Sequence, residues 1–106
     1  MKFVIEGMPE YKMNLWHVIG RCGSDIQINN TFTCIVPYKA TVTENDVLVT
    51  YGEKISICLK IEKIFAYGRE LDEWSKGMTA LLVLSGDGNK LDNDMVLLSE
   101  PESLLI

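Results

Sequence analysis

The amino-acid sequence predicts an all-β protein, built as a small closed or partly open β-barrel of six to seven strands. One observation is strict alternation of apolar and polar residues over 55–62, which is the period of a half-buried strand. The second is a pair of runs, 80–84 and 95–98, that are apolar at every position, as in strands covered on both faces. The third is glycine placement beside most of the expected turns.

The earlier elements follow the same rules. Residues 26–28 and 31–36 alternate on either side of Asn29-Asn30, which tolerates a positive φ, so a strand, a tight turn and a strand are expected to form a hairpin. Residues 39–54 read as a polar, mobile connection containing one short strand at Val47-Leu48-Val49 and Tyr51.

The later elements carry two irregularities. Ile64 is out of phase with Ile61, which indicates a β-bulge or the end of a strand. Residues 69–74 have the i, i+3 spacing of one helical turn through Leu71 and Trp74; the turn is short, so we place it in a structured loop where both side chains plug one end of the barrel. Gly77 then lets the chain leave that loop at a tight angle, and residues 85–89 reverse it between the two apolar runs.

The length and composition of the chain limit the classes of function that it can have. The chain has 106 residues, 47% of them hydrophobic and 24% charged, which predicts one globular domain over 1–106. No apolar run is long enough for a bilayer span and no secretory leader is recognisable, so a cytoplasmic protein is expected. Cys22, Cys34 and Cys58 are odd in number and widely spaced, which favours reduced, buried thiols. The net charge of −5 disfavours nucleic acid as a partner without excluding it.

The sequence gives only a weak indication of a catalytic or metal-binding site. His17 is the only histidine and lies five residues from Cys22, with no local signature of a nucleophile pair. The oxygen-bearing side chains at Asp87, Asn89, Asp92 and Asp94 lack the spacing of a calcium-binding loop and are interpreted as solvated turn residues. The sequence therefore predicts no enzyme activity, no metal and no cofactor.

The glycine and strand pattern resembles the translation-protein β-barrel, the second domain of elongation factor Tu and its relatives, over residues 18–99. In "HVIGRCGSDIQINNTFTCI", Gly20 matches the family's first glycine, Gly23 or Ser24 stands for the second, and Asn29-Asn30 occupies the family's Gly-Asp turn. In the second half, Gly77 precedes the strand "MTALLVLSG" as the family's glycine does.

The sequence departs from the family at 92–94, where Asp-Asn-Asp stands in place of a turn through Ile and Gly. A phosphate-binding G-x-x-x-x-G-K-[ST] motif is also absent, so the resemblance is to a stand-alone domain without its GTPase partner. Such a domain implies a surface suited to docking. None of the family's RNA contacts falls on a matched position, because the matched residues are glycines and core residues.

We therefore expect a non-enzymatic cytosolic binding module that docks a protein partner. The alternative is a translation-associated module that contacts the ribosome or transfer RNA, which would require Lys39, Lys54, Lys60 and Lys63 to gather on one face.

The candidate binding residues are four aromatic residues, which protein interfaces favour, and the basic residue beside the matched Gly20: Tyr11, Trp16, Tyr38, Tyr51 and Arg21. Each has a plain structural alternative, the aromatics as caps on the barrel ends and Arg21 as a solvated strand residue. A homodimer through an exposed strand edge is a further alternative.

Overall fold

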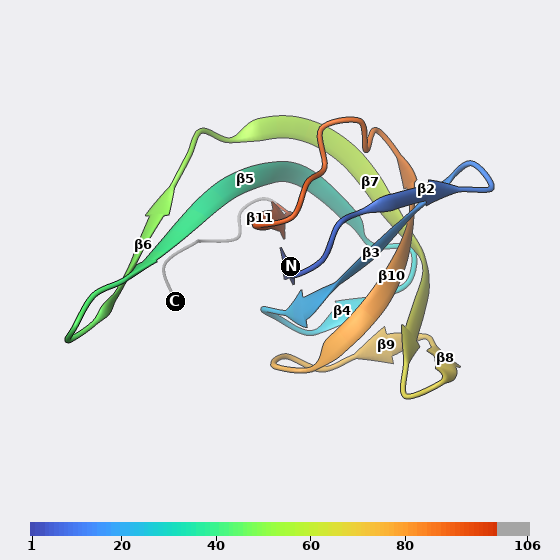
Figure 1. The fold of residues 1–106 in the computed structure, drawn as a ribbon. Helices are drawn as coiled ribbons and strands as arrows, with labels where there is room; N and C mark the ends of the chain where they lie inside the picture. Colours follow the sequence, from blue (N-terminus) through green and yellow to red (C-terminus); the bar gives the residue numbers. More distant parts are fainter. Residues whose placement is uncertain (100–106) are drawn as a thin grey trace.

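The structure, a computed structural model, describes residues 1–99, and all of its regular elements are strands (Figure 1). Residues 100–106 of the expected single domain lie outside the described residues. The strands are β1 (Lys2–Ile5), β2 (Glu10–Lys12), β3 (Leu15–Cys22), β4 (Ile26–Gln27), β5 (Thr31–Val42), β6 (Val47–Tyr51), β7 (Ile55–Ala66), β8 (Arg69–Leu71), β9 (Glu73–Trp74), β10 (Thr79–Gly86) and β11 (Met95–Leu98). The all-β class is confirmed.

Six strands close a ring within one antiparallel sheet, in the order β5, β11, β1, β3, β10, β7 and back to β5. The ring closes because β5 is long enough to serve three neighbours. Its first part pairs with β7 from Thr31 to Ile35 and with β11 from Cys34 to Pro37, and its last part pairs with β6 from Tyr38 to Val42. The end of β5 and β6 therefore leave the ring together as a projecting hairpin (Figure 1).

The main core fills the inside of the ring. Along β7 the side chains of Ile57, Leu59 and Ile61 are buried and the residues between them face outward, as the alternation predicts. The β7–β10 register then shifts, with Leu84 opposite Ile61 but Val83 opposite Lys63. This is the predicted β-bulge: the extra residue, Glu62, restores Ile64 to the inside, where it is fully buried.

The turn into β10 depends on Gly77, whose φ of +88° lies in the left-handed region that other residues rarely adopt. Its N–H donates to the Cys22 carbonyl at 2.8 Å, so the turn is held against the end of β3. The predicted tight exit from the Trp74 segment is confirmed, and β10 and β11 match both predicted apolar strands.

Three expectations are wrong. Asn29 does adopt a positive φ, but the strand before it, β4, pairs with β9 and not with β5, so residues 26–36 are no hairpin. Residues 69–74 form strands β8 and β9, with no helical turn, because β7 and β4 supply backbone partners that a single isolated turn would lack. Leu71 and Trp74 nevertheless pack against the main core. Cys22 and Cys34 are buried free thiols as expected, whereas Cys58 is exposed on the outer face of β7.

Residues 39–54 differ from the expected polar connection as well. Strand β6 is confirmed at 47–51, but β5 continues through Val42 and pairs with it along its whole length, so the segment is an ordered two-stranded hairpin. Within residues 1–99 the structure holds no helix of the length and apolarity needed to cross a membrane.

Candidate functional site

The projecting hairpin of residues 38–51, called the arm below, presents two chemically different faces. Residues directly opposite one another in an antiparallel pair share a face. The pairs on one face are Tyr38 with Tyr51, Ala40 with Val49, and Val42 with Val47, so this apolar arm face carries no charge and no polar group except two phenol hydroxyls. The opposite, polar arm face consists of Lys39 with Thr50 and Thr41 with Leu48.

The apolar arm face is open to solvent over most of its length. Val42 is 78% exposed, Val47 53%, Val49 46% and Tyr51 45%. Scattered single apolar residues are common on protein surfaces, but a contiguous apolar patch usually marks an interaction site.

Hydrogen bonds hold the tip of the arm in one conformation. The Thr43 N–H donates to the Asp46 carbonyl at 2.8 Å, and the Asp46 N–H donates to Thr43 Oγ1 at 3.1 Å. The Val47 N–H donates to the Asp46 carboxylate at 2.8 Å. The arm is therefore a regular two-stranded extension of β5 that ends in a hydrogen-bonded turn.

The apolar arm face continues into a second buried cluster on the outside of the ring. That cluster comprises Cys34 and Val36 of β5 with Val96 and Leu98 of β11, and Val4 and Tyr38 pack against it. Cys34, Val36, Tyr38, Ala40 and Val42 are alternate residues of one strand and so share a face. Tyr38 joins the buried cluster to the exposed arm.

The base of the arm is acidic. Burial raises the pKa of the Tyr38 phenol, and the nearby carboxylates of Asp94 and Glu6, with Tyr51, raise it further. Glu6 also contacts Arg21, whose Nε lies 3.6 Å from Glu6 Oε1. The phenol therefore stays protonated and able to donate a hydrogen bond across the neutral pH range.

Arg21 lies on β3 with its guanidinium committed to two partners of this chain. Besides Glu6, it donates from NH1 to the Gly77 carbonyl at 3.3 Å. This arrangement matches the alternative role given to Arg21 from the sequence, a solvated strand residue. Tyr38 and Tyr51 are paired on the arm, whereas Arg21 lies on β3, which β1 and β11 separate from β5.

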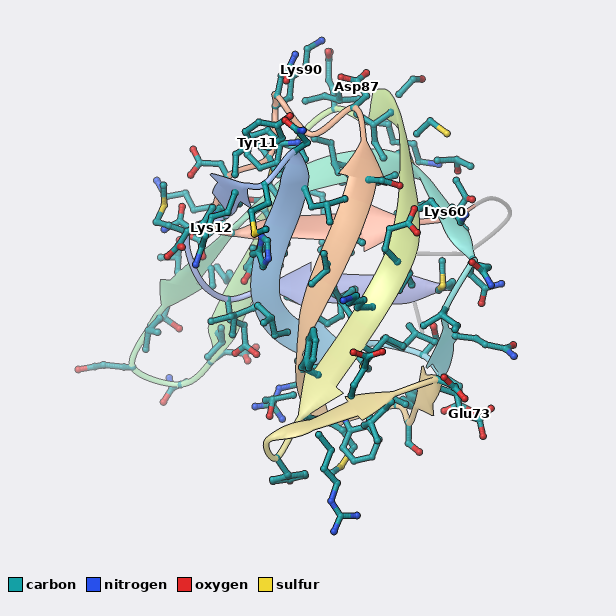
Figure 2. The ribbon with its side chains drawn as sticks, turned by 90° about the vertical axis from the view of Figure 1, so that its right-hand side faces the viewer. Tyr11, Lys12, Lys60, Glu73, Asp87 and Lys90 are labelled. Atoms are coloured by element: carbon teal, nitrogen blue, oxygen red, sulfur yellow. The ribbon has the colours of Figure 1, made fainter. Side chains whose placement is uncertain are left out.

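Tyr11 and Trp16 form a separate aromatic pair at another part of the ring. Their ring centroids are 4.7 Å apart, and they are register partners of β2 and β3. Trp16 packs on the main core, and a Cβ added to Gly88 would approach its Cδ1 to 2.5 Å, so the β10–β11 loop lies directly on the indole. Tyr11 is exposed beside that loop, at the end of the ring where Figure 2 shows Tyr11, Asp87 and Lys90. Trp16 thus caps the core, and Tyr11 covers it.

The groups considered for catalysis are not arranged as a catalytic site. Burial raises the pKa of the Cys22 thiol to about 11, with a smaller contribution from Asp25, so its nucleophilic thiolate form is disfavoured. His17 is five residues away on β3, and its Nδ1 is buried without a hydrogen-bond partner among the described residues. The described part of the chain holds no cluster of three or more residues suited to a metal ion.

A surface pocket of about 450 Å³ lies at the other end of the ring from Tyr11, beside the paired strands β4 and β9. Asp25, Gln27 and Glu73 contribute its polar lining and Trp74 an aromatic wall; Figure 2 places Glu73 at this end of the molecule. Two of its polar groups are already used, because Asp25 Oδ1 accepts from the Lys76 N–H at 2.8 Å and the Trp74 indole donates to the Thr79 carbonyl at 2.9 Å. The pocket lies beside a turn that these hydrogen bonds stabilise.

Sequence reasoning missed the apolar arm face, although it named Tyr38 and Tyr51. The available signal was the alternation of Tyr38, Ala40 and Val42, which continues the pattern of β5 beyond Pro37. The polar residues of the tip, 43–46, obscured it.

Comparison with known proteins adds no relative: no protein-family model, no curated protein and no solved structure matches this chain.

Proposed function

We propose that the chain is a non-enzymatic cytosolic binding module that docks a protein partner on the apolar arm face. The observation that carries the proposal is the exposure of Val42, Val47, Val49 and Tyr51 on one face of an ordered projecting hairpin.

The energetics of a two-stranded hairpin support this proposal. An isolated pair of strands is marginally stable in water, and it gains stability when a hydrophobic face is covered. Burial contributes about 25 cal/mol for each Å² of apolar surface, so covering the outer part of the arm would stabilise both the arm and the complex. Aromatic residues at the base, Tyr38 and Tyr51, add rigid contact area and hydroxyl groups that can bond a partner.

We further infer that the six-strand ring is a barrel of the type found in the second domain of elongation factor Tu. Support comes from the residues that carry the resemblance. Gly20 lies where a side chain would overlap β1, and Gly77 needs its positive φ, so both glycines of the pattern have a structural reason to be glycine.

Two observations on the lysine residues disfavour the translation-associated alternative. The Lys60 ammonium lies 3.8 Å from the Glu62 carboxylate, which offsets its charge. Lys39 is on the arm, outside the ring, whereas Lys60 and Lys63 are on β7.

The test compares three tagged proteins in pull-downs from host lysate, with and without nuclease. The face variant, Val47→Thr with Val49→Thr, makes the apolar arm face polar while keeping β-branched residues suited to a strand. The matched control, Leu48→Thr, makes the same kind of change on the polar arm face of the same strand.

We expect a nuclease-resistant protein to be captured by the wild type and by Leu48→Thr and to be lost with the face variant. Circular dichroism of all three proteins checks that they are folded. Identical capture by all three would refute docking on this face. Capture of transfer or ribosomal RNA that is lost at moderate salt would instead support the translation-associated role.

A further inference from the structure

The open edge of β6 has a pattern of backbone groups that suits a second copy of itself. Among residues 1–99, β5 is the only strand that pairs with β6. The Tyr38 N–H donates to Asp94, away from β6, whereas the Pro37 carbonyl accepts from Gly52. Because backbone direction alternates along a strand, Leu48 and Thr50 point their N–H and C=O toward β5, and Val47, Val49 and Tyr51 point theirs toward the open edge.

We propose that two copies of this chain pair through this edge, β6 antiparallel to β6, about a two-fold axis at Val49. This register places Val49 opposite itself and Val47 opposite Tyr51 of the partner subunit, so all three edge-facing residues are matched. Shifting by one residue would place an apolar residue opposite a polar one and is disfavoured.

Four inter-subunit hydrogen bonds result without breaking any bond of the arm. Two join the Val49 residues reciprocally. Two more run from the Tyr51 N–H of each copy to the Val47 carbonyl of the partner subunit. The Val47 N–H keeps its bond to the Asp46 carboxylate, which is 2.8 Å long.

Charge supports the same register. Natural edge strands are commonly protected by charged residues, yet Val47–Tyr51 has none. Just beyond its ends, the register brings Asp46 against Gly52 of the partner subunit, which is uncharged. No like charges are therefore directly opposed, although each chain has a net charge of −5.

The pairing joins the two arms into a four-stranded sheet with the apolar arm faces side by side on one surface, because opposite residues share a face. The dimer uses the backbone edge of β6 and not the side chains of the apolar arm face, so dimerisation and partner docking can be tested separately.

The experiment measures mass by sedimentation equilibrium from micromolar concentrations to about 1 mM, a range that reaches weak association. We expect the wild type to dimerise within this range. Val49→Pro removes the central edge-facing N–H but none of the bonds between β5 and β6, since that N–H points outward. It should raise the dimer dissociation constant at least about tenfold, given the loss of two central bonds. The matched control, Val49→Thr, keeps the N–H and should remain dimeric.

Hydrogen exchange locates the contact. Amides of Val49 and Tyr51 should exchange more slowly as protein concentration rises, while those of Leu48 and Thr50 should not change. A chain that is monomeric throughout the range would overturn the inference. So would a dimer that tolerates Val49→Pro and shows no concentration-dependent protection at Val49. A wild type that stays monomeric while still capturing its partner would refute this inference alone and leave the proposed function standing.

Discussion

Replacing Gly20 with alanine tests how closely β1 and β3 approach in the ring. The new Cβ would overlap the Val4 carbonyl oxygen and lie 2.7 Å from Phe3 Cε2 and 2.9 Å from the Val4 carbonyl carbon. Ordinary carbon–carbon contacts are about 3.5 Å or longer, so β1 would have to retreat by roughly 0.6 Å or more. The obstacle is mainly backbone, which rotamer changes do not relieve.

The expected cost combines two effects. Overpacking of a well-packed interior costs about 1 to 3 kcal/mol. Retreat of β1 also strains its ladder with β3, where Ile5 pairs with Gly20, and each net hydrogen bond lost costs about 0.5 to 1.5 kcal/mol. We therefore expect Gly20→Ala to lower the free energy of unfolding by about 1.5 to 4.5 kcal/mol, a large part of the stability of a domain of this size.

The assay is urea unfolding followed by circular dichroism and tryptophan fluorescence. Gly7→Ala is the matched control, because among residues 1–99 a Cβ at Gly7 would have only Ile19 Cβ within 4 Å, at an ordinary 3.8 Å. We expect that variant to be within about 1 kcal/mol of the wild type in either direction. If Gly20→Ala unfolded within about 0.5 kcal/mol of the wild type, the close approach of β1 and β3 would be refuted.

Three further predictions concern residues of β3 and β7. Trp16→Ala should cost about 2 to 4 kcal/mol of stability, because the indole packs on the main core, and an unchanged urea midpoint would contradict that role. Of the three thiols, Cys58 alone should react rapidly with a disulfide reagent at pH 8 in the folded protein; fast reaction of two or three would contradict the burial of Cys22 and Cys34. The pKa of Cys22 is raised to about 11 from an ordinary 9.0, so between pH 9 and pH 11 this thiol ionises in the unfolded chain and stays protonated in the folded one. The free energy of unfolding should therefore fall over this pH range by up to about 1.4 kcal/mol per pH unit. In Cys22→Ala that part of the slope should disappear.

Several strands could be predicted because their evidence is local. In β7, the period-two alternation appears in consecutive residues, and even the bulge is visible as the change of phase at Ile64. Strand β11 is apolar at every position because it is covered on both faces, Leu97 by the main core and Val96 by the outer cluster. In β10, Leu82 lies in the main core, while Leu81 on the other face is only partly buried.

The residues of the candidate binding site were predicted less well than the strands, because the type of a residue does not reveal which other residues surround it in the fold. Tyr11, Trp16, Tyr38 and Tyr51 were grouped as aromatics, yet the structure separates the Tyr11–Trp16 pair from the arm. Arg21 was chosen for standing beside Gly20, and its guanidinium is occupied by Glu6 and Gly77.

Local pattern therefore sufficed for the all-β class, for the positions of β7, β10 and β11 and for the turns at Asn29 and Gly77, since alternation and backbone preference depend on residues near in sequence. Pairing depends on partners far away in sequence. Strand β4 joins β9 and not its neighbour β5, and β5 pairs with three strands in succession before leaving the ring. The closure of the ring decided which apolar residues of β5 became core and which, beyond Pro37, remained exposed on the arm. The reason is that burial depends on the strands packed around a residue as well as on its own hydrophobicity.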